Sequence, residues 1–148
     1  IKYFILKTNA QKDFTFNPKE SLSFDGATGP YLQYTHARIC SIFRKAESEP
    51  SRNIADNYPW NEAEISVMIQ LARFPDVVQQ SASDRNPAFL CGYVYDLCRS
   101  FNKFYYEPPI RKAEAESTIQ VRLQLCKAVR NVLRNNLNLL GITALEKM

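Results

Sequence analysis

Apolar side chains recur every three or four residues along most of this chain, which is the period of an amphipathic helix. In the segment 31–46, the largely apolar side of the predicted helix consists of Leu32, Thr35, Ile39, Ile42, Phe43 and Ala46. The opposite side is polar and consists of Tyr34, Arg38, Ser41 and Lys45. The stretch 48–60 is mostly polar, contains two prolines and has no helical period, so it predicts a loop.

The next two predicted helices are separated by a proline. Asn61 and Glu64 have the spacing of a capping box, in which each side chain bonds the backbone N–H of the other residue. The helix that they begin is predicted to pass through Ile65, Met68, Ile69 and Ala72. Pro75 interrupts this pattern, and a short helix through residues 77–78 is expected before a break at 84–87.

The two longest apolar stripes lie in the second half of the chain. The first consists of Leu90, Val94, Leu97, Cys98, Phe101 and Phe104. It is expected to stop at Pro108 and Pro109, which cannot continue a helix. The second consists of Ile119, Leu123, Cys126, Val129, Leu133, Leu137 and Leu140. Gly141 follows it as a natural C-cap, and the whole pattern predicts an all-α fold, a helical bundle with short connections.

The turn "GATGP" at 26–30 has two possible roles, because a glycine-rich turn before a helix can cradle phosphate or can simply begin the helix. A phosphate loop needs Lys followed by Ser or Thr after its glycines, whereas here Pro30, Tyr31 and Leu32 follow. Thr28 can cap the first turn, and Pro30 suits an early helical position because its missing N–H costs nothing there. The residues therefore favour a helix start.

Composition argues against several classes of site. The chain has 148 residues, of which 45% are hydrophobic and 23% charged, so one globular domain is expected. No apolar run approaches the length that crosses a bilayer. The cysteines form no C-x-x-C pair, and the lone His36 cannot complete a usual zinc set, so we predict buried, reduced thiols and no metal site. These cysteines are Cys40, Cys91, Cys98 and Cys126.

Basic residues are concentrated near the end of the chain. The net charge is only +4, but the segment 117–145 contains no acidic residue. Within it, Lys127, Arg130 and Arg134 have the spacing i, i+3 and i+7, which places them on one side of a helix. Such a stripe is usually a solvated surface, but it is also what a phosphate backbone attracts.

The eight tyrosines allow a second nucleic-acid feature, because an exposed aromatic ring can stack on an unpaired base. For any one tyrosine, half-buried packing is the commoner role. Neither a Ser/His/Asp set, nor a Cys/His set, nor a cluster of paired carboxylates is present to support catalysis. From the residues alone, the chain is a helical bundle with a basic, tyrosine-bearing side.

Three stretches of the chain are distinctive in their order and spacing. They are "GATGPYLQYTHARICSI" at 26–42, "CRSFNKFYYEPPI" at 98–110 followed by "VRLQLCKAVRNVL" at 121–133, and "NLLGITALEKM" at 138–148. Together they closely resemble the C-terminal region of arginyl-tRNA synthetases. These are class I enzymes, and this region is their anticodon-binding domain, a helical bundle of the DALR type. The resemblance spans nearly the whole chain.

The resemblance also divides the chain into two expected parts. Residues 1–24 resemble the tail of the segment that leaves the catalytic domain, and residues 25–148 resemble the anticodon-binding bundle. Ala88 stands where the family often has His, and Leu145 and Lys147 stand where it often has Pro and Arg. The His-Ile-Gly-His and Lys-Met-Ser-Lys-Ser types of ATP-binding signature do not occur in these residues. We therefore expect a piece of a longer protein, with no catalytic residue of its own.

The function implied by the resemblance belongs to the longer protein. That enzyme would use ATP and Mg²⁺ to attach arginine to tRNA(Arg), as a monomer in the cytoplasm. This chain would hold no cofactor and would bind tRNA rather than DNA or a membrane. The alternative, a helical protein-interaction module without an RNA role, stays open on the residues alone.

The resemblance also implies which residues read the central anticodon base. They are tyrosines of the first bundle helix, a later tyrosine and the last methionine: Tyr31, Tyr34, Tyr105 and Met148. Arg38, one turn beyond Tyr34, is a fifth candidate, and a flipped cytosine would stack between the flat tyrosine rings. Met148 could instead be a frayed end without a role, but the apolar "LLGI" before it predicts a tail that is held on the bundle.

Overall fold

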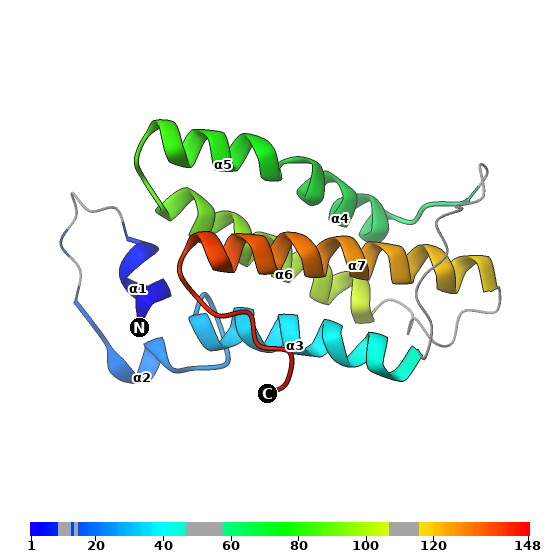
Figure 1. The fold of residues 1–148 in the computed structure, drawn as a ribbon, viewed down its shortest axis with the longest axis horizontal. Helices are drawn as coiled ribbons and strands as arrows, with labels where there is room; N and C mark the ends of the chain where they lie inside the picture. The colour runs from blue at the N-terminus through cyan, green and yellow to red at the C-terminus, as the bar shows by residue number, and fades with distance from the viewer. Residues whose placement is uncertain (9–12, 14, 47–57, 107–115) are drawn as a thin grey trace.

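Every regular element that the computed structural model describes is a helix. The described residues are 1–8, 13, 15–46, 58–106 and 116–148, and within them there is no strand. In chain order the helices are α1 (Lys2–Leu6), α2 (Pro18–Ser21), α3 (Gly29–Ala46), α4 (Glu62–Ala72), α5 (Phe74–Ser83), α6 (Ala88–Tyr106) and α7 (Glu116–Leu139). This confirms the predicted all-α bundle (Figure 1). The predicted stop at Pro108 and Pro109 and most of the predicted loop 48–60 lie outside the described residues.

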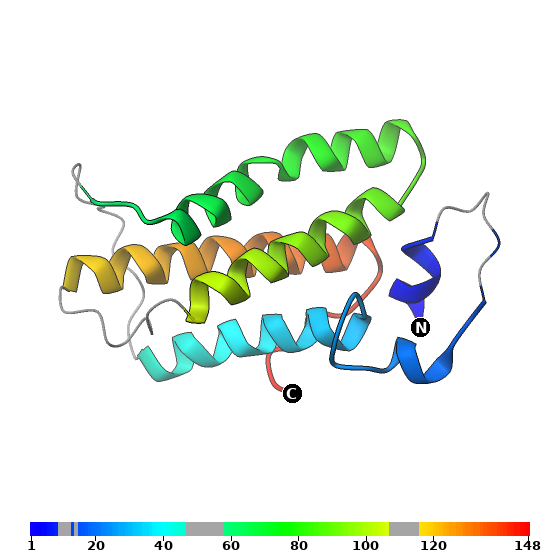
Figure 2. The same ribbon diagram turned by 180° about the vertical axis from the view of Figure 1, so that it is seen from behind.

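Helices α3, α6 and α7 run alongside one another and form the body of the bundle. Helices α4 and α5 follow each other almost in line and pack on α6, and α4 also contacts α7 (Figures 1 and 2). The short helix α1 lies at one end of the bundle, and the chain after α7 returns across α3 (Figure 1). None of the helices in the described ranges combines the length and the apolar character that a bilayer crossing requires.

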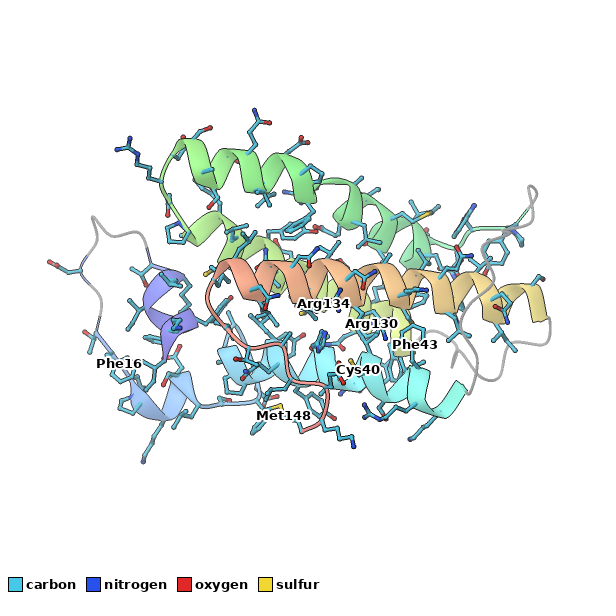
Figure 3. The ribbon with its side chains drawn as sticks, viewed as in Figure 1. Phe16, Cys40, Phe43, Arg130, Arg134 and Met148 are labelled. Carbon is cyan, nitrogen blue, oxygen red and sulfur yellow. The ribbon has the colours of Figure 1, made fainter. Side chains whose placement is uncertain are left out.

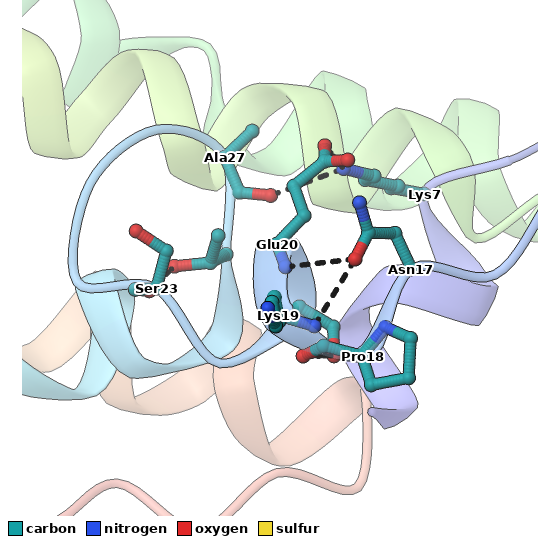
Figure 4. A network of polar contacts seen from close by, with 9 residues as sticks. Lys7, Asn17, Pro18, Lys19, Glu20, Ser23 and Ala27 are labelled. Atoms are coloured by element: carbon teal, nitrogen blue, oxygen red, sulfur yellow. Dashed lines mark hydrogen bonds and ion pairs between the residues drawn. The ribbon is translucent and has the colours of Figure 1, made fainter.

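A small polar network holds the segment that precedes α3. Asn17 caps α2, because its Oδ1 accepts from the backbone N–H groups of Lys19 at 3.1 Å and Glu20 at 3.3 Å (Figure 4). The Lys7 ammonium donates to the carbonyl of Ala27 at 3.3 Å and lies 4.0 Å from the Glu20 carboxylate. These contacts hold the segment that precedes α3 close to the end of α1.

The turn at 26–30 begins a helix, as the residues favoured. The Thr28 Oγ1 accepts from the backbone N–H of Tyr31 at 3.3 Å and donates to the Ser23 carbonyl at 2.5 Å. Gly26 has a φ of +78°, a backbone conformation that residues with a side chain rarely adopt. The cap and the turn together set the direction in which α3 leaves.

The predicted capping box of α4 is present, but the sequence did not predict which side of α4 is exposed. The Glu64 backbone N–H donates to Asn61 Oδ1 at 2.9 Å, and the Asn61 backbone N–H donates to Glu64 Oε2 at 3.1 Å. Ile65 and Ile69 of the predicted apolar pattern are 42% and 57% exposed. The side of α4 that is buried carries Ala63, Glu64 and Val67.

Glu64 is turned inward because it forms an ion pair with Arg122 of α7. The Arg122 Nε lies 3.0 Å from the Glu64 Oε1, and both side chains are 1% exposed. Tyr58 donates its hydroxyl to the same Glu64 oxygen at 2.9 Å, and the Arg122 guanidinium lies 4.9 Å from the ring centroid of Phe104. The pair joins α4, α6 and α7, so this cation of the acid-free segment is structural.

All four cysteines are buried and unpaired, as predicted. Burial raises the pKa of the Cys91, Cys98 and Cys126 thiols to about 12. These side chains therefore act as small apolar residues of the core at neutral pH.

The end of α7 is a Schellman motif around Gly141, which has a φ of +65°. The Ile142 N–H donates to the Leu137 carbonyl at 2.8 Å, and the Gly141 N–H donates to the Asn138 carbonyl at 2.9 Å. This confirms the predicted C-cap. The motif reverses the chain and sends the last residues back over α3.

Candidate nucleic-acid interface

One side of α3 places a cation on an aromatic ring. Tyr34 and Arg38 are one helical turn apart, and the Arg38 guanidinium lies 4.7 Å from the Tyr34 ring centroid. Hydrogen bonding from Arg38 lowers the pKa of the Tyr34 hydroxyl. Because Tyr34 is 41% exposed, this positively charged platform faces solvent.

Asn102 of α6 connects Arg38 to Tyr31. The Arg38 Nη1 donates to the Asn102 Oδ1 at 3.2 Å, and the Asn102 Nδ2 donates to the Tyr31 hydroxyl at 2.7 Å. The amide thus uses its oxygen for one side chain and its nitrogen for the other, which fixes their relative positions. Tyr31 is half-buried, and burial raises the pKa of its hydroxyl.

The end of α6 supplies two more tyrosines to the same cluster. Tyr105 is half-buried, Tyr106 is 68% exposed, and their ring centroids lie 5.4 Å apart in an edge-to-face arrangement. The Arg38 guanidinium lies 5.5 Å from the Tyr105 centroid and 5.8 Å from the Tyr106 centroid. It also donates to the Tyr106 hydroxyl at 3.4 Å, so Arg38 is surrounded by the rings of Tyr34, Tyr105 and Tyr106.

Two hollows open over this cluster. The larger, of about 910 Å³, is lined by Tyr34, Ala37, Arg38, Ser41, Ile42, Arg44, Lys45, Tyr105, Tyr106, Lys147 and Met148. The smaller, of about 590 Å³, is lined by Phe24, Asp25, Tyr31, Tyr34, Arg38, Asn102, Tyr106 and Met148. Both hollows share Tyr34, Arg38, Tyr106 and Met148 as walls. Each has the volume of a pocket for a small ligand or for one extruded base.

The tail after α7 brings Met148 to this shared wall. Leu140 is buried, and Ile142 and Ala144 pack against the core, so the tail is held on the bundle as predicted. In Figure 3 the tail crosses α3, and Met148 lies at the edge of α3 away from α7. The Met148 side chain is 58% exposed there.

The five residues predicted for base reading therefore meet in space. Tyr34, Arg38, Tyr105 and Met148 surround the larger hollow, and Tyr31 lies at the smaller one. They come from three separate parts of the chain, namely α3, the end of α6 and the tail. Their role in base reading remains a prediction.

The three residues of the basic stripe predicted for the RNA backbone, Lys127, Arg130 and Arg134, differ in their exposure. Arg134 is exposed, whereas Lys127 and Arg130 are half-buried. The Arg130 guanidinium lies 4.5 Å from the ring centroid of Phe43, and its buried Nε has no hydrogen-bond partner. In Figure 3, Arg130 and Arg134 lie on the α7 side of α3, across from Met148. Unlike Met148, the stripe residues Lys127, Arg130 and Arg134 line neither hollow. The stripe is therefore separate from the residues that line the hollows.

Several residues around the hollows were missed by the sequence analysis. Tyr106 and Asn102 are members of the quoted stretch 98–110, but nothing in their spacing separates them from packing residues. Arg44, Lys45 and Lys147 line the rim of the larger hollow. Basic residues in the last turn of a helix, such as Arg44 and Lys45, are also expected simply because they complement the helix dipole.

The arrangement suits recognition of a flat, electron-rich group beside an anion. Tyrosine rings offer stacking surfaces, Arg38 offers a stacked cation, and the rim cations offer partners for phosphate. Across the residues that the structure describes, no group of three or more His, Cys, Asp or Glu side chains is placed to hold a metal ion.

Comparison with known proteins gives one family. The chain matches the model of the DALR anticodon binding domain over residues 32–148. Similar proteins include the arginine–tRNA ligases of Phocaeicola vulgatus, 42% identical over 152 residues, and of Treponema denticola, 42% identical over 154 residues. The matches cover 100% of this chain but only 25% and 26% of those proteins, so the chain spans about a quarter of the length of these relatives.

Arginyl-tRNA synthetases are also found among the solved structures that share this fold. The arginyl-tRNA synthetase of Thermus thermophilus matches 99% of this chain with a TM-score of 0.91 and 34% identity, and 26% of that chain is covered. The arginyl-tRNA synthetase of Plasmodium falciparum matches 99% of this chain with a TM-score of 0.83 and 31% identity, and again 26% of that chain is covered.

Proposed function

The chain belongs to the DALR anticodon binding domain family, and from this premise we propose that it is the tRNA-binding part of an arginine–tRNA ligase. The observation that carries the proposal is the convergence of Tyr34, Arg38, Tyr105 and Met148 on one hollow. Rings and a stacked guanidinium suit an unpaired base, which has π-faces on both sides. The base proposed for this hollow is the central base of the anticodon.

The remaining activity belongs to the longer protein. We propose that it joins arginine to tRNA(Arg) with ATP and Mg²⁺, as a monomer in the cytoplasm, and that this chain contributes tRNA recognition without binding the cofactors itself. Relatives about four times as long, which are named arginine–tRNA ligases, support this division of labour. Within the chain, we propose that residues 1–24 lead from the catalytic part and that residues 25–148 form the recognition bundle.

The proposal predicts salt-dependent binding of tRNA(Arg) by this chain. Cations on the rim of the larger hollow and on α7 would release counterions from the RNA backbone, so affinity must fall as salt rises. Electrophoretic mobility of tRNA(Arg), measured at two salt concentrations, gives the result. A protein-interaction module would leave the migration of tRNA unchanged at both concentrations, and that outcome would reject the proposal.

Neutralising Lys127, Arg130 and Arg134 together, each to Gln, is expected to weaken tRNA binding roughly tenfold and to flatten its salt dependence. Phosphate contacts position the RNA while base contacts specify it, so arginine tRNA and other tRNAs should lose affinity equally. Filter binding at several salt concentrations measures both effects.

A matched control removes three exposed cations from other elements, Lys19, Arg73 and Arg99, and therefore makes the same change in net charge. This control is expected to weaken binding much less. Selective loss of arginine tRNA by the α7 variant, or an equal loss in the control, would contradict the assignment of these residues to the RNA backbone.

A further inference from the structure

We propose that Gln33, His36 and Arg44 form a clamp that positions Met148 between the two hollows, and that tRNA affinity depends on this clamp. These three α3 side chains are called the tail clamp below. The inference deepens the proposed function and rests on it, because Met148 matters for binding only if the hollows receive RNA. The clamp residues Gln33 and His36 line neither hollow.

The tail clamp consists of side-chain donors on α3 and backbone acceptors in the tail. The Gln33 Nε2 donates to the Thr143 carbonyl at 2.8 Å. The His36 Nδ1 lies 2.8 Å from the Leu145 carbonyl, and the Arg44 Nη1 donates to the Glu146 carbonyl at 2.9 Å. All acceptors belong to the backbone, so the clamp fixes the path of the tail without requiring particular side chains on it.

His36 is the central member of the clamp. A carbonyl oxygen can only accept, so the His36 Nδ1 carries the proton and donates to Leu145. His36 is 2% exposed, whereas the Gln33 and Arg44 bonds lie at the surface. The bond from His36 to Leu145 is part-buried, so water competes for it less than for the two surface bonds, and its loss should affect the tail more.

Apolar packing alone does not hold the last residues. Ile142 and Ala144 pack against the core, but Glu146, Lys147 and Met148 are all exposed. Residues 142–148 form no helix or strand, so backbone hydrogen bonds within the tail do not order them. The bonds from α3 are therefore the contacts that bring the tail to Met148 in a defined direction.

Helix α3 carries both the tail clamp and three of the five base-reading candidates, Tyr31, Tyr34 and Arg38. Tyr34 and Arg38 lie on it between Gln33 and Arg44, on the side that the hollows occupy. A tail that is fixed to α3 places Met148 relative to Tyr34 and Arg38, whatever small movements the other helices make. Because a preordered side chain does not lose its freedom again on binding, the clamp should raise affinity.

The first test observes the position of Met148 without RNA. The chain contains only two methionines, Met68 and Met148, so ¹³C-methyl methionine labelling gives two signals when the chain is released from a cleavable tag. Met148 shares the walls of both hollows with Tyr34 and Tyr106, so ring currents should move its methyl signal away from the free-methionine position. In His36→Ala that signal should move to the free-methionine position and sharpen, while the Met68 signal on α4 stays in place and reports that the fold is intact.

Two further variants keep this test decisive. His36→Asn retains a donor where Nδ1 stood and should restore the shifted Met148 signal. Gln33→Ala removes a surface member and should move the signal in the same direction by a smaller amount, which decides the matter even if His36→Ala does not fold. An unmoved Met148 signal in folded His36→Ala, or in Gln33→Ala if His36→Ala does not fold, would overturn the clamp.

The second test links the clamp to RNA. His36→Ala should weaken tRNA(Arg) binding about three- to tenfold, the effect of having to order one flexible segment on binding. In a Met148→Ala background the same change should have almost no further effect. An equal loss in both backgrounds would show that His36 acts without Met148 and would overturn the inference. Absence of tRNA binding by the unaltered chain would instead reject the proposed function. The methyl signals would still test whether the tail clamp positions Met148.

Discussion

Replacing Arg122 with methionine is expected to lower the free energy of unfolding by about 3–5 kcal/mol, because it leaves Glu64 as a buried charge without its partner. The two side chains are 1% exposed and 3.0 Å apart, so water cannot replace the guanidinium. The change also removes the cation from the Phe104 ring in the last turn of α6. Urea denaturation followed by far-ultraviolet circular dichroism measures the difference.

Two variants separate loss of the pair from loss of a basic side chain. Arg134→Met removes an exposed arginine from the same helix and should change stability by less than about 0.5 kcal/mol. The double variant Arg122→Met with Glu64→Gln removes both charges and keeps an oxygen that accepts from Tyr58, so it should recover much of the loss. If Arg122→Met is no less stable than Arg134→Met, the pair does not have the structural role assigned to it.

Tyr105→Ala is expected to weaken tRNA(Arg) binding about 5- to 150-fold, which corresponds to the roughly 1–3 kcal/mol that one base–aromatic stack contributes. The Tyr105 ring forms a wall of the larger hollow and is held in place against Phe101 and Tyr106, with centroid distances of 6.1 and 5.4 Å. Its removal therefore opens the wall. Fluorescence anisotropy with labelled tRNA(Arg) measures the change.

The control for this prediction keeps the ring and removes only the hydroxyl. Tyr105→Phe should bind within a few-fold of the unaltered chain, because stacking uses the face of the ring. A tRNA(Arg) transcript with a changed central anticodon base should lose little further affinity in Tyr105→Ala, since the pocket for that base is already damaged. An equal loss on both transcripts would mean that Tyr105 supports the domain without reading the base.

The helices themselves were predictable because their signals are local. The capping box of Asn61 and Glu64, the Thr28 cap and the Gly141 C-cap all join residues within five positions of one another. A helical period needs only the same short range, because each turn repeats its hydrogen bonds over four residues. The family resemblance added the base-reading candidates. Four of them line the larger hollow and Tyr31 lines the smaller one, while their role in base reading stays a prediction.

Burial and partnership were decided only by the tertiary structure. The apolar period of α4 did not show that Ile65 and Ile69 face outward, because that depends on Glu64 reaching Arg122, 58 residues away. Arg122 and Lys127 both lie in the acid-free segment 117–145, yet Arg122 is buried in an ion pair and Lys127 is half-buried.

The same distinction applies to the candidate site. Asn102 joins Arg38 across 64 positions of the chain, and His36 joins Leu145 across 109. Composition and spacing carry information about local structure, such as the hydrogen bonds within one segment. They therefore specified the helices, their caps and the residue types available for recognition. Which side chains become partners depends on how the helices pack and where the chain reverses, so the Arg38 cluster, the shared wall at Met148 and the tail clamp exist only in the folded bundle.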